Sequence, residues 1–186
     1  MDVIKDGRTW RIGTASDVAW IADHTIPGNT VNAAVPPVFE AYATFYQPDG
    51  VDTARHERAV VRVLTEQSAD QPWWLGYLDT GAYDIVFNDA PKVSLYWGWA
   101  YVLVLAGPEQ ALSWRTGHLR GGETGALPDL IFPLDRSWLV SALWDDTWTD
   151  IGGPVNLIEA LVSDPLANAR RVRPDEDAVP PGLTRE

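Results

Sequence analysis

The sequence predicts a single α+β domain with a mostly antiparallel sheet of about six strands, N-terminal helices and a C-terminal helix packed against the sheet. Three observations predict this class. Helical patterns lie in the first 68 residues, closely spaced strand-like segments follow from residue 72, and one more helical segment begins after Pro154. Strands that follow one another in a run favour antiparallel pairing. We expect the domain to span residues 1–169, and residues 170–186, which mix charges and prolines, to form an extended or frayed tail.

The first 68 residues are expected to form a short strand and three helices. Thr14 or Ser16 can cap the first helix with a side-chain oxygen. Pro36-Pro37 can open the second, because proline is tolerated in the first turn of a helix. Apolar residues recur at helical spacing through the third, which makes it the clearest helix of the sequence. The expected elements are a strand over residues 9–13 and helices over Asp17–His24, Val38–Tyr46 and residues 53–68.

Between residues 72 and 128 the pattern changes from helical to strand-like. Short apolar segments alternate with turn residues, which is typical of antiparallel strands. Pro108 can then open a short helix, and a glycine-rich loop follows it. The expected elements are strands over residues 72–78, 83–87, 93–97 and 99–106, a helix over Glu109–Trp114 and a loop over residues 118–128.

The stretch Asp135–Val162 is expected to form the centre of the fold. Its first strand places apolar residues on both faces, because side chains of a strand alternate. Such a strand belongs in the middle of a sheet or beneath helices. A turn at Asp145-Asp146, a return strand and a helix opened by Gly152-Gly153-Pro154 should follow. Trp138, Val140, Ala142 and Trp144 share one face of the first strand, and Leu139 and Leu143 share the other.

The formal net charge of −12 argues against a nucleic-acid partner, because phosphate binding needs a basic footprint. The charge is unevenly distributed. Residues 129–169 carry seven acids against Arg136 alone, a balance of −6. This local excess predicts either an ordinary solvated surface or a patch that steers a basic partner toward the protein.

The chain has no cysteine, which excludes disulfides and thiolate chemistry. Its N-terminus lacks the apolar segment of a signal peptide, and no run approaches 18 apolar residues. We therefore expect a cytoplasmic protein that has no membrane partner. The sequence leaves the oligomeric state open.

The sequence contains no recognisable catalytic or metal-binding pattern. His56-Glu57 lacks the second histidine of a zinc peptidase helix, and no Gly-x-Ser-x-Gly elbow is present. Gly152-Gly153 lacks the lysine and hydroxyl of a phosphate-binding loop. The acids after Trp144 do not follow the alternate spacing of a calcium loop. The sequence predicts no metal and no cofactor, and it favours a non-enzymatic protein without deciding the question.

The leading hypothesis is a domain that binds another protein through an acidic surface near the 145–150 turn, a surface that suits a basic partner. It rests on the local charge excess, the missing catalytic patterns and ten tryptophans. Buried indoles supply core packing, whereas exposed ones are typical of interfaces. The expected partner-binding residues are Asp145, Asp146, Asp150 and Trp148.

The alternative hypothesis is a pocket protein or enzyme for a small polar ligand or sugar, with indoles as walls. His118 lies in the glycine-rich loop between two arginines, where a histidine could serve a site. The expected lining residues are Arg115, His118, Arg120, Trp97 and Trp99.

Three motifs carry a resemblance to known families. Residues 72–81 (PWWLGYLDTG), 107–115 (GPEQALSWR) and 135–146 (DRSWLVSALWDD) resemble a family of uncharacterised bacterial proteins, which implies no activity. Residues 35–42 (VPPVFEAY) are more weakly similar to the proline-led helix of the SUKH superfamily of immunity proteins. That resemblance implies an α+β domain that neutralises a toxin partner. The glycine pair that usually follows that helix is missing, and no binding residue is carried over.

Overall fold

A computed structural model describes the chain except for residues 69, 82–84, 116–124, 145 and 184–186. Ten antiparallel strands of the described part form one sheet in the order β1-β2-β6-β4-β7-β8-β9-β3-β10, and β5 pairs with β6 beside this path. The α+β class is confirmed, but about six strands is an undercount. The strands are β1 Asp2–Lys5, β2 Arg8–Ile12, β3 Ala41–Phe45, β4 Trp73–Leu78, β5 Val93–Leu95, β6 Trp99–Ala106, β7 Leu130–Pro133, β8 Leu139–Ser141, β9 Thr149–Gly153 and β10 Ala169–Val172.

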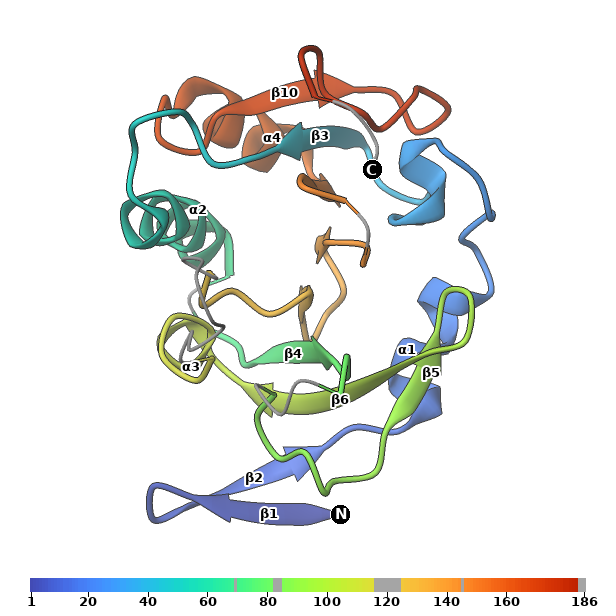
Figure 1. Ribbon diagram of the computed structural model, residues 1–186, viewed down its shortest axis with the longest axis vertical. Coiled ribbons are helices and arrows are strands. Elements are labelled where there is room, and N and C mark those ends of the chain that lie inside the picture. Colours follow the sequence, from blue (N-terminus) through green and yellow to red (C-terminus); the bar gives the residue numbers. More distant parts are fainter. Residues whose placement is uncertain (69, 82–84, 116–124, 145, 184–186) are drawn as a thin grey trace.

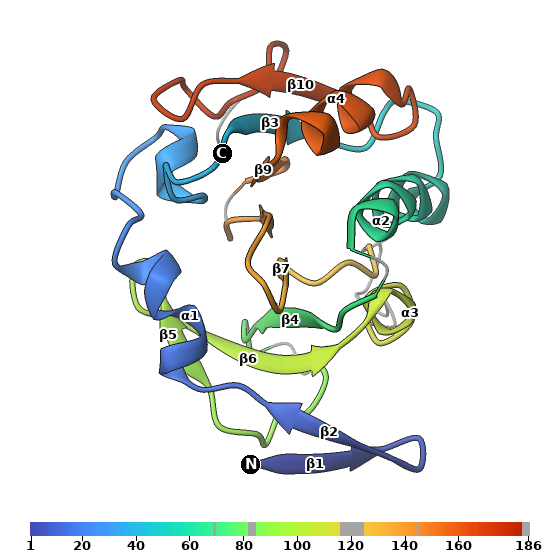
Figure 2. The ribbon, with the colours of Figure 1, turned by 180° about the vertical axis from the view of Figure 1, so that it is seen from behind.

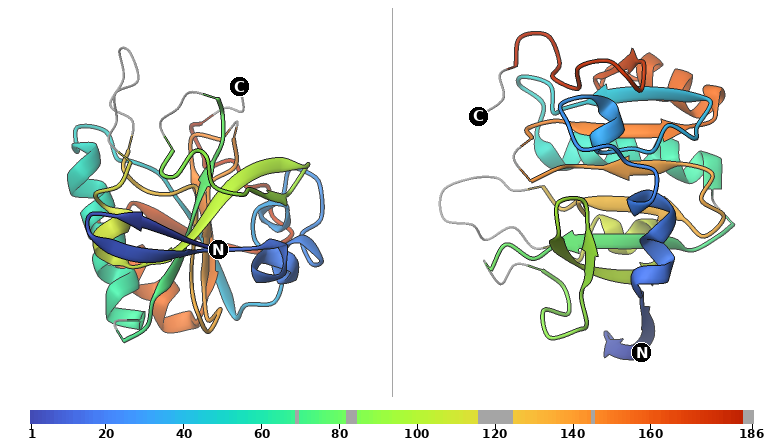
Figure 3. Two further views of the ribbon diagram at one scale, coloured as in Figure 1. Left: turned by 90° about the horizontal axis from the view of Figure 1, so that it is seen from below. Right: turned by 90° about the vertical axis from the view of Figure 1, so that its right-hand side faces the viewer.

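Helices cover both faces of the sheet. Figure 1 shows α2 and α3 on one side and α1 on the other, and the view from below in Figure 3 repeats this division. Figure 2 shows α4 against β3 and β9, near the β10 end of the sheet. The helices are α1 Ala15–Ala22, α2 Thr53–Ser68, α3 Pro108–Ala111 and α4 Val155–Ser163, with a 3-10 turn η1 over Val31–Ala33.

Two hydrophobic cores result from the period-two alternation of the strands. In β4 every residue is buried, with Trp73, Leu75 and Tyr77 on the α2 face and Trp74 and Leu78 on the α1 face. We call the cluster on the α2 face the first core and the cluster on the α1 face the second core. A sheet that is apolar on both faces needs helices on both, and α1 together with η1 supplies the second cover.

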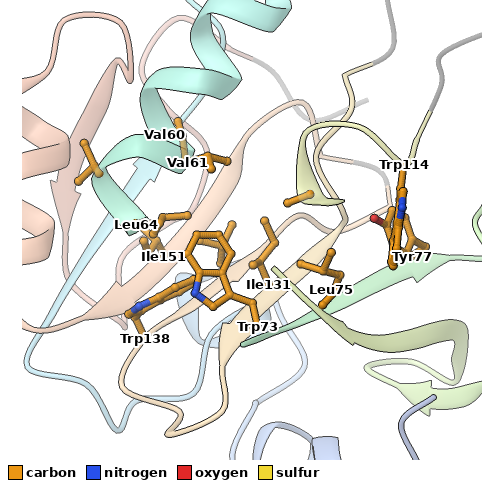
Figure 4. Close-up of a cluster of buried hydrophobic side chains, with 14 of the residues drawn as sticks. Val60, Val61, Leu64, Trp73, Leu75, Tyr77, Trp114, Ile131, Trp138 and Ile151 are labelled. Atoms are coloured by element: carbon orange, nitrogen blue, oxygen red, sulfur yellow. The ribbon is translucent and has the colours of Figure 1, made fainter. Parts of the chain in front are cut away.

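Two buried indoles pack against each other in the first core. Trp73 and Trp138 are fully buried and meet edge to face, with ring centroids 5.1 Å apart at 89°. Figure 4 shows this pair beneath Leu64 of α2, and Tyr77 beside Trp114 at the far end of the same core. Edge-to-face contact suits the quadrupoles of the two rings.

The expected central hairpin forms in part. β8 and β9 pair beside β7, the middle strand of the sheet order, and alternation places Trp138 and Val140 in the first core but Leu139 in the second. β8 ends at Ser141, however. Trp144 therefore lies beyond the strand, where it is 51% exposed.

The predicted helix over Val38–Tyr46 is wrong. Ala41–Phe45 forms β3 and pairs with both β9 and β10. All five of its residues are buried, and two-sided pairing satisfies its backbone groups, so tertiary context overrides the proline signal before it. The phenol of Tyr42 accepts the amide of Phe39 at 2.8 Å and fixes the turn that leads into the strand.

The predicted strand over residues 83–87 also differs from the structure. Residues 83 and 84 lie outside the described part, and Ile85 to Phe87 form a bend and a turn. Phe87 has a positive φ of 57°, which an extended strand does not allow.

The boundary expected at residue 169 falls inside β10, which pairs with β3 along its whole length. Beyond it, the amide of Val31 donates to the carbonyl of Glu176 at 3.1 Å, and the amide of Ala178 donates to Asn29 at 3.1 Å. Arg170 pairs with Glu176 at 2.7 Å. The chain after residue 169 is therefore joined to the sheet and to the η1 segment as far as it is described.

Candidate partner-binding surface

The structure does not place the expected acidic residues on one surface. Trp148 is 2% exposed and belongs to the second core. Asp150 in β9 is 1% exposed. Asp146 is half-buried in the turn, and Asp145 lies outside the described residues. A partner that contacts the folded surface therefore meets Asp146 but neither Trp148 nor Asp150.

Asp150 lies instead in a polar row that crosses the second-core face of the sheet. Register places it opposite Thr44 of β3 on one side and Ser141 of β8 on the other, and Arg170 of β10 lies opposite Thr44. The Ser141 hydroxyl is 2.6 Å from the phenol of Tyr96, which donates to the carbonyl of Ala34. Through Tyr96, Ser141 thus links the loop of the β5–β6 hairpin and the end of η1 to β8.

Arg115, expected in a ligand pocket, is used inside the fold. Its guanidinium forms a two-pronged ion pair with Asp129 and donates to the carbonyl of Leu127 at 2.9 Å. It also lies over the ring of Tyr77, 5.4 Å from the ring centroid. Asp129 in turn accepts the amide of Leu78 at 2.8 Å. A bidentate pair of this kind fixes geometry, so it holds the segment around Leu127 and Asp129 against β4.

Of the described residues of the expected pocket, Trp97 and Trp99 lie apart from Arg115. His118 and Arg120 lie outside the described residues. Trp97 and Trp99 lie at the β5–β6 turn, where Trp99 packs against the second core, whereas Arg115 contacts Tyr77 of the first core. Burial raises the pKa of the Tyr77 phenol, and the nearby Arg115 charge opposes that rise.

The tight β5–β6 hairpin positions two of these indoles. Leu95 pairs with Trp99, so only Tyr96, Trp97 and Gly98 form the loop. Tyr96 and Gly98 have positive φ values of 54° and 92°. Glycine adopts this region without strain, which allows so short a loop. Trp97 and Trp99 consequently approach to 4.9 Å between ring centroids.

Three indoles gather at this end of the sheet, and we call Trp97, Trp99 and Trp144 the indole edge. Trp144 reaches it from the segment after β8 and lines a common hollow with Trp99. Trp97 is 49% exposed and Trp144 is 51% exposed, whereas every other tryptophan is buried or half-buried. Large exposed aromatic groups that lie together mark binding surfaces.

The indole hollow is a surface depression of about 160 Å³ between the ends of β4, β6 and β8. Among the described residues that line it, only Asp79 carries a carboxylate, which accepts the amide of Gly81 at 3.0 Å and pairs with the Lys92 ammonium at 2.8 Å. The Lys92 ammonium lowers the pKa of the Asp79 carboxyl, and the Gly81 amide adds to this effect. The lining residues are Leu78, Asp79, Thr80, Trp99, Ala100 and Trp144.

The sequence predicts Trp97 and Trp99 as lining residues, but it predicts Trp144 on a buried strand face and Asp79 in a turn. A usable signal exists for Trp144. It stands directly before the acidic pair at 145–146, where a turn must end the strand. Nothing in the local sequence of Asp79 indicates that Trp99 lies beside it, because that proximity depends on the antiparallel register of β4 and β6.

Comparison of the chain with protein-family models, with curated proteins and with solved structures finds no match. Among the described residues, no helix combines the length and the apolar character that a membrane span requires. Within the same residues, no group of three or more histidine, aspartate or glutamate side chains could hold a metal ion.

Proposed function

We propose that this chain is a non-enzymatic protein-binding domain and that the indole edge is the centre of its contact surface. The observation that carries the proposal is the joint exposure of Trp97 and Trp144, 49% and 51%, around the half-buried Trp99. Burial of an indole at an interface removes a large apolar area from water. Tryptophan is also enriched among the residues that dominate binding energy.

The charge of the chain supports a basic partner. A net charge of −12 attracts a positively charged protein over a longer range than the indoles can act, and this raises the association rate. Among the described acidic residues of the expected patch, Asp146 lies two residues from Trp144 and is partly exposed, whereas Asp150 is buried. We therefore centre the proposed surface on the neighbourhood of Trp144 instead of on the whole 145–150 turn that the sequence predicts.

An immunity-type role, in which the partner is a toxin, is the most specific form of this proposal. It depends on the weak similarity of residues 35–42 to SUKH immunity proteins, and it stays a prediction. The same holds for a cytoplasmic location and for the lack of a nucleic-acid partner, which rest on the sequence alone.

Affinity capture followed by reconstitution tests the proposal. The protein captured by the wild-type chain is purified, and its Kd is measured by calorimetry against the Trp97→Ala/Trp144→Ala double variant. Loss of two interface indoles should weaken binding by at least about tenfold. The matched control is Ile4→Ala/Val162→Ala, which removes exposed apolar side chains elsewhere and should leave the Kd unchanged. A double variant that binds like the wild type would refute the proposal.

A second candidate function is the binding of a small polar ligand or sugar at a different place. An open pocket of about 500 Å³ lies between the β1–β2 hairpin and α3, within the roughly 300–1,000 Å³ that is usual for ligand sites. Trp10 and Trp114 supply aromatic walls and meet edge to face at 4.8 Å. The polar groups around it belong to Lys5, Asp6, Arg8, Glu109, Gln110 and Ser113.

Titration with a panel of neutral and acidic monosaccharides distinguishes this candidate. Trp10→Ala should abolish any binding at this pocket, and Trp97→Ala should leave it intact. Sugar binding that is lost only in Trp97→Ala would place the ligand at the indole edge and remove support for the β1–β2 pocket.

A further inference from the structure

We propose that the indole hollow receives one arginine side chain of the partner, with its guanidinium against Trp99 and Trp144 and beside the Asp79 carboxylate. This inference rests on the proposed protein-binding function and names the group that the site recognises. Four features of the hollow support it, namely its walls, its carboxylate, its size and the charge around it.

The walls favour a flat cation. Trp99 and Trp144 line the hollow from two different strand ends, and Leu78 and Ala100 complete its apolar part. An indole face attracts a cation electrostatically, and tryptophan is the best of the aromatic side chains in this respect. Guanidinium is planar and more weakly hydrated than ammonium, so it stacks on an aromatic face at a lower desolvation cost.

The carboxylate already holds a cation of this chain. Lys92 Nζ lies 2.8 Å from Asp79 Oδ2, and the two side chains are 33% and 26% exposed. A partly exposed pair of this kind contributes little to stability, so a competing cation can displace Lys92 or share the carboxylate with it. An ionised carboxylate has about four acceptor positions, and the Gly81 amide and Lys92 occupy two of them. Asp79 therefore keeps capacity for an incoming guanidinium.

The size limits the occupant. A volume of about 160 Å³ is smaller than the roughly 300–1,000 Å³ of a typical small-molecule site. A single long side chain that enters from a protein surface fits this space better than a free ligand, and Trp97 beside the hollow can contact the surrounding backbone of the partner. The chain's charge of −12 and the Asp79 carboxylate disfavour an acidic side chain as the occupant.

The direct test uses short peptides as probes. Acetyl-Gly-Arg-Gly-amide is titrated into ¹⁵N-labelled protein, and the indole Nε1–H signals, assigned with single Trp→Phe variants, report where it binds. The citrulline peptide is the matched control, because citrulline is a neutral isostere of arginine. We expect millimolar binding that shifts Trp99 and Trp144, and affinity for the citrulline peptide at least about tenfold lower.

Variants sharpen the test. Asp79→Asn should weaken the arginine peptide by about tenfold, Lys92→Met should strengthen its binding, and Trp97→Ala should change it little. Equal binding of the two peptides, or shifts confined to other indoles, would overturn the assignment. If the partner is lost in Trp97→Ala/Trp144→Ala but binds normally to Asp79→Asn, only the guanidinium assignment fails. If the arginine peptide binds as expected while the partner ignores the double variant, the proposed function fails instead.

Discussion

The Trp73–Trp138 pair and the Trp97–Trp99 pair have almost the same ring separation, 5.1 Å and 4.9 Å, in opposite surroundings. Trp73 and Trp138 are 0% exposed, and both ring nitrogens donate to Ser68. Trp73 donates to the Ser68 carbonyl at 3.4 Å, and Trp138 donates to the Ser68 hydroxyl at 2.8 Å. Trp97 is 49% exposed at a hairpin tip. The comparison shows that tryptophan stabilises the core where helices cover it, and that it can contact a partner where it is exposed at the end of the sheet.

The largest expected effect comes from breaking the buried pair. Trp138→Ala should lower the free energy of unfolding by about 3–5 kcal/mol, because it removes a large buried side chain and leaves a cavity beside Trp73. Trp97→Ala should change it by less than about 0.5 kcal/mol, as is usual for surface positions. Urea unfolding of both variants gives the two values, and equal losses would contradict the division between cohesive and available indoles.

A smaller effect should follow from removing the acceptor of the buried pair. Ser68→Ala leaves the Trp138 ring nitrogen buried without its 2.8 Å partner, which should cost about 1–3 kcal/mol of stability. The control is Ser113→Ala, since Ser113 is exposed and its hydroxyl only donates back to its own helix turn at Glu109. Thermal unfolding of the two variants side by side makes the measurement. Matching midpoints would show that the indole nitrogen does not depend on Ser68.

The smallest effect concerns pH at the indole edge. The Lys92 ammonium holds the pKa of the Asp79 carboxyl below its ordinary 3.8. In the folded state the carboxylate is therefore charged at neutral and mildly acidic pH. A carboxyl whose pKa is lowered by folding stabilises the fold at a pH above its unfolded pKa. This stabilisation is lost as the pH falls through the pKa of the folded state. The affinity of the arginine peptide should accordingly stay constant from about pH 8 to pH 5 and fall only below about pH 4. A midpoint near neutral pH would show that Asp79 is not the group responsible.

Several elements were predictable because local pattern and burial agree. Helix α2 has a strong helical period and forms over Thr53–Ser68 as expected. Strands β4 and β6 are apolar throughout, and both form. Strand β3 was mistaken for a helix because a short apolar run fits either period, and only its pairing with β9 and β10 decides between them.

The site was less predictable, because its residues meet through register rather than through spacing in the sequence. Trp148 and Asp150 were expected at the surface, but Trp148, directly before β9, packs into the second core, and Asp150 and Gly152 lie on the face of β9 that Phe39 and Val35 cover. A Cβ on Gly152 would lie 2.4 Å from the Phe39 ring, so residues around 39 cover this face closely. The described acidic residues of the 145–150 segment therefore lie in two different environments, Asp146 at the turn and Asp150 inside the sheet.

Fluorine NMR of the chain labelled with 5-fluorotryptophan tests the central claim most directly. Its ten indole signals, assigned by single Trp→Phe variants, are followed as the reconstituted partner is added. If the indole edge is the contact surface, the signals of Trp97, Trp99 and Trp144 shift or broaden at the lowest partner concentrations while those of Trp73 and Trp138 do not. Shifts confined to Trp10 and Trp114 would contradict this result and place binding at the β1–β2 pocket.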